Sequence, residues 1–323
     1  MIQVPLLAAR VDAVNVLCEG VLGIDLIPSE RSTAWPLAEP GAHIDAYLAN
    51  GLVRQYSIYQ ATPDGRGYRI AVQREAESRG GSAWLHQSLK VGDAMSISVP
   101  RNAFPLVAAP RYLFIAGGIG ITPIVSMVRE VRRRDIECKL FYCTRNAQRT
   151  AFRETLSAPH PSGSVSFVHD DGDPSRGLDL RAAIGPFDGL AELYCCGPTG
   201  LMSAVKQVAT EQNWPESHQH FEHFKRSEEL PAPDPRTFRI RIASTNEVFE
   251  VGPDETVLEV LRAHDIIVDS SCEQGLCGTC RVGVLEGIVD HRDEVLASAD
   301  KAANSAMTTC CSRALSEELV LDL

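Results

Sequence analysis

The sequence lacks any apolar run that approaches the roughly 18 residues needed to cross a membrane. Its first residues also lack the basic and then apolar segments of a secretory signal. We therefore expect a cytoplasmic protein that makes no membrane contact. A formal net charge of −11 offers no basic surface for a phosphate backbone, so nucleic-acid binding is not expected.

The chain also lacks the cysteine density of a small secreted scaffold, because its 10 cysteines are spread over 323 residues. Six of them fall in or beside apolar stretches, and we expect these to be reduced thiols. These six are Cys18, Cys138, Cys143, Cys195, Cys196 and Cys311.

The length of the chain predicts two or three domains, each with its own core.

The other four cysteines have a spacing that predicts a metal cluster. Three lie at C-x4-C-x2-C spacing, and a fourth follows after a further 29 residues. This is the plant-type pattern for a 2Fe-2S cluster, whose two irons need thiolates from several directions. Gly275 and Gly278 would let the loop turn tightly and bring its N–H groups near the sulfurs. The weaker alternatives are scattered core thiols and a zinc site, and structural zinc usually takes a C-x2-C pair in each half. The predicted ligands are Cys272, Cys277, Cys280 and Cys310.

The fourth ligand must be chosen from two adjacent cysteines, Cys310 and Cys311. Neighbouring side chains on a strand point to opposite faces, so we expect only one of the two to reach the cluster. The distance along the chain from Cys280 favours Cys310. Cys311 is then expected to be a buried free thiol.

The cysteine motif lies in an acidic C-terminal segment. Residues 237–323 hold 16 acidic and 7 basic side chains, a formal charge of −9. This charge either serves solubility or steers an electron-carrying cluster to a basic face of a partner. The pattern predicts an α+β domain, with Asp254 placed to cap its helix. The expected elements are a hairpin of residues 238–242 and 247–251, a helix over 256–262, and strands over 281–285 and 319–323.

Residues 1–105 consist of short alternating strands separated by turn clusters, which predicts an antiparallel β-barrel. Within it, Arg54 and Tyr56 would share one face of a strand, with Ser57 pointing the other way or from the strand's end. A cation beside an aromatic ring suits a planar cofactor. An ordinary barrel strand is the alternative.

Gly80, Gly81 and Ser82 precede a short helical run. Free N–H groups at the start of a helix offer a cradle for a phosphate. An equally good alternative is that Ser82 only caps the helix.

The segment from about residue 110 to 225 alternates strands and helices, which predicts an α/β domain with a parallel sheet. An apolar strand over 112–116 runs into a glycine turn, and a helix follows over 124–134. Strand, turn and helix start together form a dinucleotide-phosphate site, although G-x-G-x-x-G is absent. The turn residues expected to bind are Gly117, Gly118, Gly120, Thr122 and Pro123.

Two further strand ends belong to this predicted site. A strand over 139–143 ends at Thr144 and Arg145, without an acidic residue for a ribose hydroxyl, so the residues leave NADH and NADPH open. A strand over 191–195 runs into Cys196–Pro198, where a parallel sheet would place a second active-site loop. For Cys196 alone, a buried small hydrophobic residue is the alternative.

The chain resembles the phthalate dioxygenase reductase family, which includes vanillate demethylase reductase components. The resemblance rests on three groups of motifs in this order: R-x-Y-S with G-G-S, G-G-I-G-I-T-P with C-G-P, and C-x4-C-x2-C with a distant cysteine. The resemblance covers essentially the whole chain. It implies an FMN-binding β-barrel over 1–105 and an NAD-binding α/β domain over 106–225. A proline-rich linker over 226–236 and a β-grasp 2Fe-2S ferredoxin domain over 237–323 would follow.

The resemblance also implies roles for individual residues. FMN would contact the R-x-Y-S strand through its ring and the G-G-S turn through its phosphate, and NADH would lie across the two loops of the α/β domain. The residues implied at the reacting centre are Cys196, Ser57 and Phe224. The remaining contacts are Arg54, Tyr56, Gly80, Gly81 and Ser82 for FMN, and Gly197 and Pro198 with the glycine turn for NADH. Thr144 and Arg145 are added to the predicted nucleotide site from their place at a strand end.

The implied function is that of an NADH-dependent reductase component. NADH gives up two electrons as a hydride and a 2Fe-2S cluster takes one, so a flavin between them is chemically required. The electrons would pass to a terminal Rieske-type oxygenase or demethylase that docks at the acidic ferredoxin domain. The alternatives are a reductase for a haem-thiolate monooxygenase and a non-enzymatic redox carrier or sensor.

Overall fold

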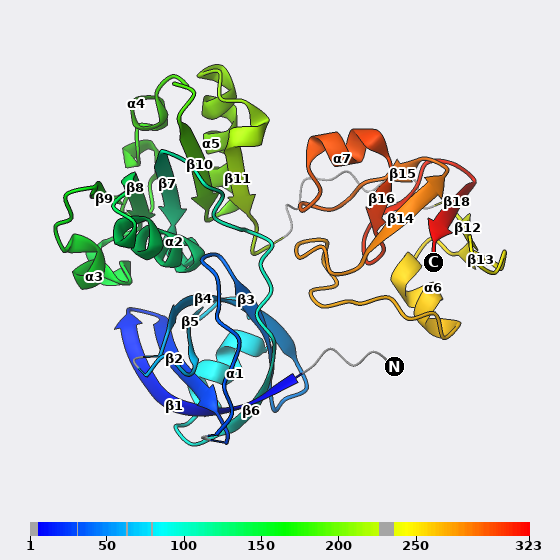
Figure 1. Ribbon diagram of the computed structural model, residues 1–323, viewed down its shortest axis with the longest axis horizontal. Helices are drawn as coiled ribbons and strands as arrows, with labels where there is room; N and C mark the ends of the chain where they lie inside the picture. Colours follow the sequence, from blue (N-terminus) through cyan, green and yellow to red (C-terminus); the bar gives the residue numbers. More distant parts are fainter. Residues whose placement is uncertain (1–5, 31, 63, 79, 226–235) are drawn as a thin grey trace. The chain divides into compact units, whose positions relative to one another are not determined.

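A computed structural model describes residues 6–30, 32–62, 64–78, 80–225 and 236–323 (Figure 1). Of the predicted linker, residues 226–235 lie outside this description. The chain forms two compact units, one ending at Glu222 and one running from His223 to Leu323. The three predicted domain boundaries stay a prediction. Within the residues described, no helix combines the length and apolar character needed to cross a membrane.

Six antiparallel strands of the first unit close into a barrel in the order β1-β2-β5-β4-β3-β6. Alternate side chains point inward, and Ile24, Ile44, Ile70 and Ile97 are fully buried there. Helix α1 adds Leu85 to this core. The predicted barrel is confirmed. Its elements are β1 (Leu6–Cys18), β2 (Val21–Pro28), β3 (His43–Tyr47), β4 (Val53–Ala61), β5 (Tyr68–Gln73), α1 (Gly81–Ser88) and β6 (Ala94–Ser98).

The same unit contains a five-stranded parallel sheet in the order β11-β10-β7-β8-β9, which confirms the predicted α/β architecture. Its strands bury both faces: Phe114 packs on the side of α2, and Ile115 packs on the side of α5. The strands are β7 (Arg111–Gly117), β8 (Glu137–Thr144), β9 (Gly163–His169), β10 (Ala191–Cys196) and β11 (Gln219–Glu222). The helices are α2 (Ile121–Arg133), α3 (Arg153–Ser157), α4 (Leu180–Ile184) and α5 (Thr199–Glu211), with a 3-10 turn η1 (Gly118–Gly120) before α2.

The barrel and the parallel sheet share one apolar core. Tyr59 and Phe104 pack with Ile124 and Met127 of α2 in the same cluster of buried side chains. Ser126 Oγ accepts a hydrogen bond of 3.0 Å from the Gly41 N–H across this contact. The face of the sheet that carries α2 is therefore the one turned toward the barrel.

The second unit is a mixed five-stranded sheet in the order β13-β12-β18-β14-β16, with β12 and β18 parallel. Val257 and Leu261 of α6 pack on this sheet, which confirms the predicted α+β (β-grasp) architecture. The main elements are β12 (Phe238–Ile242), β13 (Val248–Val251), α6 (Val257–Ala263), β14 (Arg281–Glu286), α7 (Ser298–Ala303), β16 (Ala306–Thr308) and β18 (Glu318–Asp322). A small pair, β15 (Val289–Asp290) and β17 (Arg313–Ala314), completes the unit.

Helix α6 is capped by Thr256, so the predicted cap by Asp254 is wrong. Thr256 Oγ1 accepts a hydrogen bond from the Glu259 N–H at 3.1 Å, and Glu259 Oε2 accepts one from the Thr256 N–H at 2.8 Å. A threonine followed three residues later by a glutamate satisfies two unpaired N–H groups at once, which a lone aspartate further out cannot do.

Candidate functional site

The four thiols predicted to hold the cluster lie in the second unit as two contacting pairs. Cys272 and Cys277 are in hydrogen-bond contact through their side chains. Cys280 and Cys310 form the second pair. The segment between α6 and β14 supplies three of these thiols, and the turn after β16 supplies the fourth. The fold thus brings together residues separated by up to 38 positions in the sequence.

Two pairs of thiols fit a two-iron cluster held by four cysteines. Among the described residues, no three cysteine, histidine or acidic side chains gather as ligands of one metal ion. A hydrogen bond from the Cys272 thiol lowers the pKa of Cys277 to about 4, and a hydrogen bond from Cys310 lowers the pKa of Cys280. One member of each pair therefore favours the thiolate, which is the form that binds metal.

The loop between these cysteines turns as its glycines predict. Gly275 has φ +76° and Gly278 has φ +70°, both in the left-handed region that favours glycine. The turn points the N–H groups of Gln274 and Leu276 at Cys272 Sγ, each at 3.4 Å. Such hydrogen bonds stabilise negative charge on sulfur and help to set a cluster's reduction potential.

Cys310 and Cys311 lie in a turn, not on a strand. The N–H groups of Cys311 and Ser312 both donate to Thr308 O, at 3.4 and 3.0 Å. The expectation that the two side chains face opposite ways is therefore wrong, because the turn buries both thiols in contact with each other. Their other partners differ, since Cys310 contacts Cys280 and Cys311 Sγ lies 3.2 Å from Thr308 Oγ1. Cys310 as the fourth ligand stays the prediction, and the expected burial of Cys311 is confirmed.

In the first unit, the two loops predicted to bind the nucleotide meet where the parallel strands β7 and β10 end. A Cβ atom on Gly120 would lie 2.3 Å from Cys196 O, and one on Gly117 would lie 2.6 Å from Pro198 Cδ. A Cβ atom on Gly197 would lie 2.9 Å from Gly117 Cα. Only glycine permits this approach, so these glycines set the distance between the loops.

Other residues of the glycine turn fix its shape. Gly118 has φ +53°, and its carbonyl accepts a hydrogen bond of 3.1 Å from the Tyr142 hydroxyl. Buried Thr122 donates through Oγ1 to Ile119 O at 3.0 Å. Pro123 lies buried in the first turn of α2, as predicted. Contacts of these residues with a nucleotide stay predictions.

Cys196 ends β10 in the core that the sheet shares with the barrel, whereas Cys195 faces α5. Burial raises the pKa of Cys196 well above its ordinary value, and the nearby Glu222 carboxylate raises it further. The Cys196 thiol therefore keeps its proton at neutral pH and is suited neither to act as a base nor to attack a carbon.

Glu222 is a candidate residue that the sequence analysis missed. It ends β11 directly opposite Cys196 in the parallel pairing of β10 and β11. Burial raises the pKa of Glu222 to about 8, and within the described part of the chain its Oε2 is buried without a hydrogen-bond partner. An acidic residue at a strand end was the available signal, but its place beside Cys196 depends on a register that the sequence does not reveal.

The predicted residues after β8 differ in their surroundings. Thr144 Oγ1 lies 2.9 Å from both Thr150 Oγ1 and His169 Nδ1, so this hydroxyl belongs to a side-chain network. Arg145 is exposed, and its carbonyl accepts a hydrogen bond of 2.8 Å from the Asp171 N–H. Their roles in binding a nucleotide stay predictions.

The two predicted flavin motifs lie together at one place on the barrel. A Cβ atom on Gly81 would lie 2.7 Å from Arg54 Nε, so the Arg54 side chain covers the start of α1. Tyr56 packs against the barrel core, where burial raises its pKa and keeps the phenol neutral. Ser57 is buried and pairs with His43 between β4 and β3. A guanidinium over a helix start is an arrangement that suits an anionic group such as a phosphate.

Ser82 is not the cap of α1, so that alternative is wrong. The cap residue is Gly80, with φ +89° and no side-chain hydrogen bond to the helix. Ser82 Oγ instead accepts a hydrogen bond of 3.1 Å from the Glu75 N–H, and Ser78 Oγ accepts one of 3.3 Å from the Ala83 N–H. The Ser82 hydroxyl therefore holds the preceding loop against the helix.

Phe224 lies at the start of the second unit, and 39% of its surface is exposed. Its predicted position against a flavin stays a prediction.

Comparison with protein families assigns two parts of the chain. Residues 240–315 match the 2Fe-2S iron-sulfur cluster binding domain, and residues 114–207 match the oxidoreductase NAD-binding domain. The vanillate O-demethylase oxidoreductase of Pseudomonas sp. (strain HR199 / DSM 7063) is 41% identical over 97% of this chain and 98% of its own length. Phthalate dioxygenase reductase of Burkholderia cepacia is 37% identical over 89% of this chain and 88% of its own.

Solved structures similar to this chain lead to the same family. The structure of a phthalate dioxygenase reductase, described as modular for electron transfer from pyridine nucleotides to [2Fe-2S], covers 98% of both chains with a TM-score of 0.71 and 35% identity. An intact type IV self-sufficient cytochrome P450 monooxygenase gives a TM-score of 0.87 and 36% identity over 98% of this chain, which spans 41% of that longer protein. The chain therefore belongs to the phthalate dioxygenase reductase family, oxidoreductases that act as reductase components of oxygenase systems.

Proposed function

We propose that this chain takes a hydride from NADH with bound FMN and delivers single electrons through a 2Fe-2S cluster to a Rieske-type oxygenase or demethylase. The observation that carries the proposal is the pairing of Cys272 with Cys277 and of Cys280 with Cys310. The same chain holds a glycine turn against the Cys196 loop. When bound, a flavin links these two sites, because it accepts a hydride and releases electrons one at a time.

In the proposed nucleotide site the chain's residues position the reactants. Gly117 and Gly120 let two strand ends approach each other, and a hydride moves only when donor and acceptor atoms come within roughly 3 to 3.5 Å. Cys196 keeps its proton and excludes water from the buried corner that it fills. Glu222 presents a buried carboxyl oxygen at the same corner to a polar group of the nucleotide.

In the proposed FMN site, Arg54 and the start of α1 form a cradle for the phosphate. Tyr56 and Ser57 are neighbours on the same strand, and the family resemblance assigns both of them contacts with the flavin ring. FMN, in preference to FAD, is part of the proposal and rests on the family resemblance.

The proposed partner docks at the acidic second unit. Residues 237–323 carry a formal charge of −9, and opposite charges steer association at low ionic strength. Relatives support an oxygenase as the acceptor: one is named a phthalate 4,5-dioxygenase reductase subunit from Pseudomonas putida, and another a carnitine monooxygenase reductase subunit from Escherichia coli (strain K12). We expect partner reduction to slow as salt rises; a rate that does not change with salt would contradict steering.

A second candidate acceptor is a haem-thiolate monooxygenase. The observation that favours it is the TM-score of 0.87 to part of a self-sufficient cytochrome P450. The chain is the same electron source in both cases, so the acceptor must be decided by experiment.

An anaerobic titration with NADH, followed by absorption and electron paramagnetic resonance, tests the core of the proposal. We expect stepwise reduction of a flavin and of a 2Fe-2S cluster, and release of FMN on denaturation. A purified chain that holds no cluster after iron and sulfide are supplied would overturn it. Product formation with purified Rieske oxygenases and with cytochromes P450 then identifies the acceptor, and NADPH in place of NADH measures nucleotide preference.

A further inference from the structure

A short segment, Asp293–Leu296, lies beneath the loop that carries three of the cluster cysteines; we name it the platform. The Glu294 N–H donates a hydrogen bond of 3.0 Å to Gly275 O. A Cβ atom on Gly275 would lie 3.2 Å from Asp293 Cα, and one on Gly278 would lie 3.4 Å from a methyl carbon of Val295. Both left-handed glycines of the cluster loop therefore rest on the platform.

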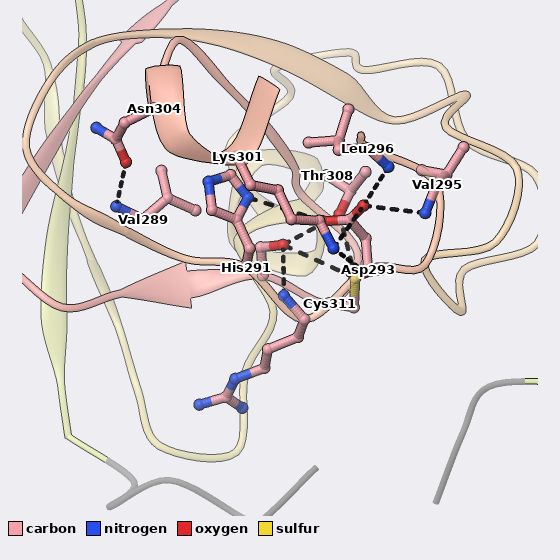
Figure 2. A network of polar contacts seen from close by, with 11 residues as sticks. Val289, His291, Asp293, Val295, Leu296, Lys301, Asn304, Thr308 and Cys311 are labelled. Carbon is pink, nitrogen blue, oxygen red and sulfur yellow. Dashed lines mark hydrogen bonds and ion pairs between the residues drawn. The ribbon is translucent and has the colours of Figure 1, made fainter. Parts of the chain in front are cut away.

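The platform takes its shape from the Asp293 carboxylate, which is fully buried. Asp293 Oδ1 accepts hydrogen bonds from the N–H groups of Val295 at 3.1 Å and Leu296 at 2.6 Å. Lys301 Nζ donates to Asp293 O at 2.5 Å and lies 3.7 Å from Oδ1. Figure 2 shows Asp293 at the centre of these contacts, with Lys301 and the two N–H groups around it. A buried carboxylate is costly unless it is hydrogen-bonded, and the contacts of Asp293 Oδ1 meet that need while they shape the platform.

Cys311 fills the space between the loop that carries three of the cluster cysteines and the turn after β16. A Cβ atom on Gly275 would lie only 2.6 Å from Cys311 Sγ. Cys311 Sγ in turn lies 3.2 Å from Thr308 Oγ1, and Figure 2 shows both residues close to Asp293. The loop is thus held from one side by the platform and from another by the Cys311 thiol.

We propose that Asp293 is a positioning residue for the cluster and that Cys311 is a packing thiol, not a ligand; this rests on the proposed 2Fe-2S site. Asp293 fixes the platform, the platform fixes Gly275, and Gly275 places the N–H groups of Gln274 and Leu276 on Cys272 Sγ. Hydrogen bonds to cluster sulfur tune its potential, and residues that orient ligands affect metal retention by about 10- to 100-fold.

The test compares three variants of the full chain with cluster bound. Asp293→Ala removes the acceptor of both N–H groups, Asp293→Asn keeps Oδ1 as acceptor, and Asp290→Ala removes a nearby acid whose carboxylate pairs with Arg292 instead. The measurements are the rate of cluster release to a chelator, the paramagnetic resonance spectrum and the midpoint potential. For Asp293→Ala we expect release faster by about 10- to 100-fold, with a changed spectrum and potential. Asp293→Asn should restore the spectrum and most of the retention, and Asp290→Ala should match the wild type.

A double-mutant cycle tests the packing role of Cys311 independently of Asp293, and Asp293→Asn still tests the positioning role if Asp293→Ala does not fold. Gly275→Ala should lose the cluster, because its Cβ atom meets Cys311 Sγ and Asp293 Cα in a left-handed backbone. Adding Cys311→Ala removes the thiol contact and should recover part of the loss. No recovery would assign the whole loss to the backbone and the platform contact, and would overturn the packing role of the thiol.

The outcomes separate this proposal from the one on which it rests. A wild-type chain that binds no 2Fe-2S cluster ends the proposed function. A wild-type chain with a cluster, and an Asp293→Ala chain that melts at lower temperature but keeps the wild-type spectrum, potential and release rate, leaves the function intact and overturns the positioning role.

Discussion

Two pairs of adjacent cysteines in this molecule have opposite fates. Cys195 and Cys196 lie on strand β10, so one packs toward α5 and the other toward the core shared with the barrel. Cys310 and Cys311 lie in a tight turn, and both thiols are buried in contact with each other and with Cys280 or Thr308. Backbone conformation, not sequence spacing, decides whether neighbouring thiols separate or cooperate.

The acid–base behaviour of the two pairs differs accordingly. Burial raises the pKa of both Cys195 and Cys196, and both remain neutral thiols. In the turn, a hydrogen bond from the Cys310 thiol lowers the pKa of Cys311 to about 7 and also lowers the pKa of Cys280. The first pair behaves as compact apolar side chains, whereas one member of the second pair, Cys310, joins the thiols proposed to bind the cluster.

The largest expected effect separates the members of the second pair. Cys310→Ser should abolish the 2Fe-2S cluster, because a hydroxyl replaces one of four thiolate ligands. Cys311→Ser should keep the cluster, since this thiol contacts Thr308 and not Cys280. Iron and sulfide content, with the paramagnetic resonance spectrum, measure both. The reverse pattern would move the ligand to Cys311 and remove the packing role proposed for it.

The same Cys310→Ser chain tests the direction of electron flow. NADH-driven reduction of ferricyanide should persist, because the proposed hydride site lies in the other unit, whereas reduction of cytochrome c should stop. If cytochrome c is still reduced at the wild-type rate, the cluster is not the exit for electrons.

A second, smaller effect is expected at the loop beside Cys196. Gly120→Ala places a Cβ atom 2.3 Å from Cys196 O, so the two loops must move apart. A displacement of about 1 Å can cost roughly 100-fold in rate, and we expect a loss of that order in flavin reduction by NADH. Stopped-flow absorption measures it. Gly200→Ala is a matched control, because no atom lies within 4 Å of its added methyl group. Equal rates in the two variants would contradict the role given to the contact.

Much of the architecture was predictable because it depends on local patterns. Alternating apolar residues gave the barrel strands, short apolar runs gave the parallel strands, and the cysteine spacing indicated the cluster ligands. The glycine turn was recognisable because it lies between strand β7 and helix α2. A few consecutive residues are enough to specify each of these strands, turns and ligand spacings.

The wrong and missing predictions concern residues whose position is decided by distant parts of the chain or by competing hydrogen-bond partners. Asp254 and Ser82 were plausible helix caps, but Thr256 with Glu259 and the loop around Ser78 took those roles. Glu222 offered only the signal of an acidic residue at a strand end, and Asp293 offered none, because each acquires its place from a strand register or loop contact far along the chain. The Cys310 turn was misread because a strand was assumed where Thr308 O collects two N–H groups.

A third and smaller effect should distinguish Cys196 from Cys195, the two members of the pair on β10. Cys196→Ala should slow flavin reduction by about 10-fold, because a thiol is lost beside the proposed nicotinamide position and loop packing loosens. Cys195→Ala should leave this rate unchanged, since its side chain faces α5. It should cost about 1 kcal/mol of unfolding free energy through the lost packing. Stopped-flow rates and thermal melting of the two chains measure the difference, and a slower Cys195→Ala chain would show that the two faces are not independent.

The smallest effect concerns the carboxyl opposite Cys196. Burial raises the pKa of Glu222 from 4.5 to about 8 in the folded chain, so between these values the folded state binds more protons than the unfolded state. The free energy of unfolding should therefore fall as pH rises through this window, by at most about 1.4 kcal/mol per pH unit, the slope for a difference of one bound proton. The Glu222→Gln side chain cannot ionise. The melting temperature of this variant should therefore rise relative to that of the wild type as pH increases from about 6 to about 8. Melting temperatures of the two chains that run parallel across this range would mean that folding does not raise the pKa of Glu222, and the burial assigned to its carboxyl would then be wrong.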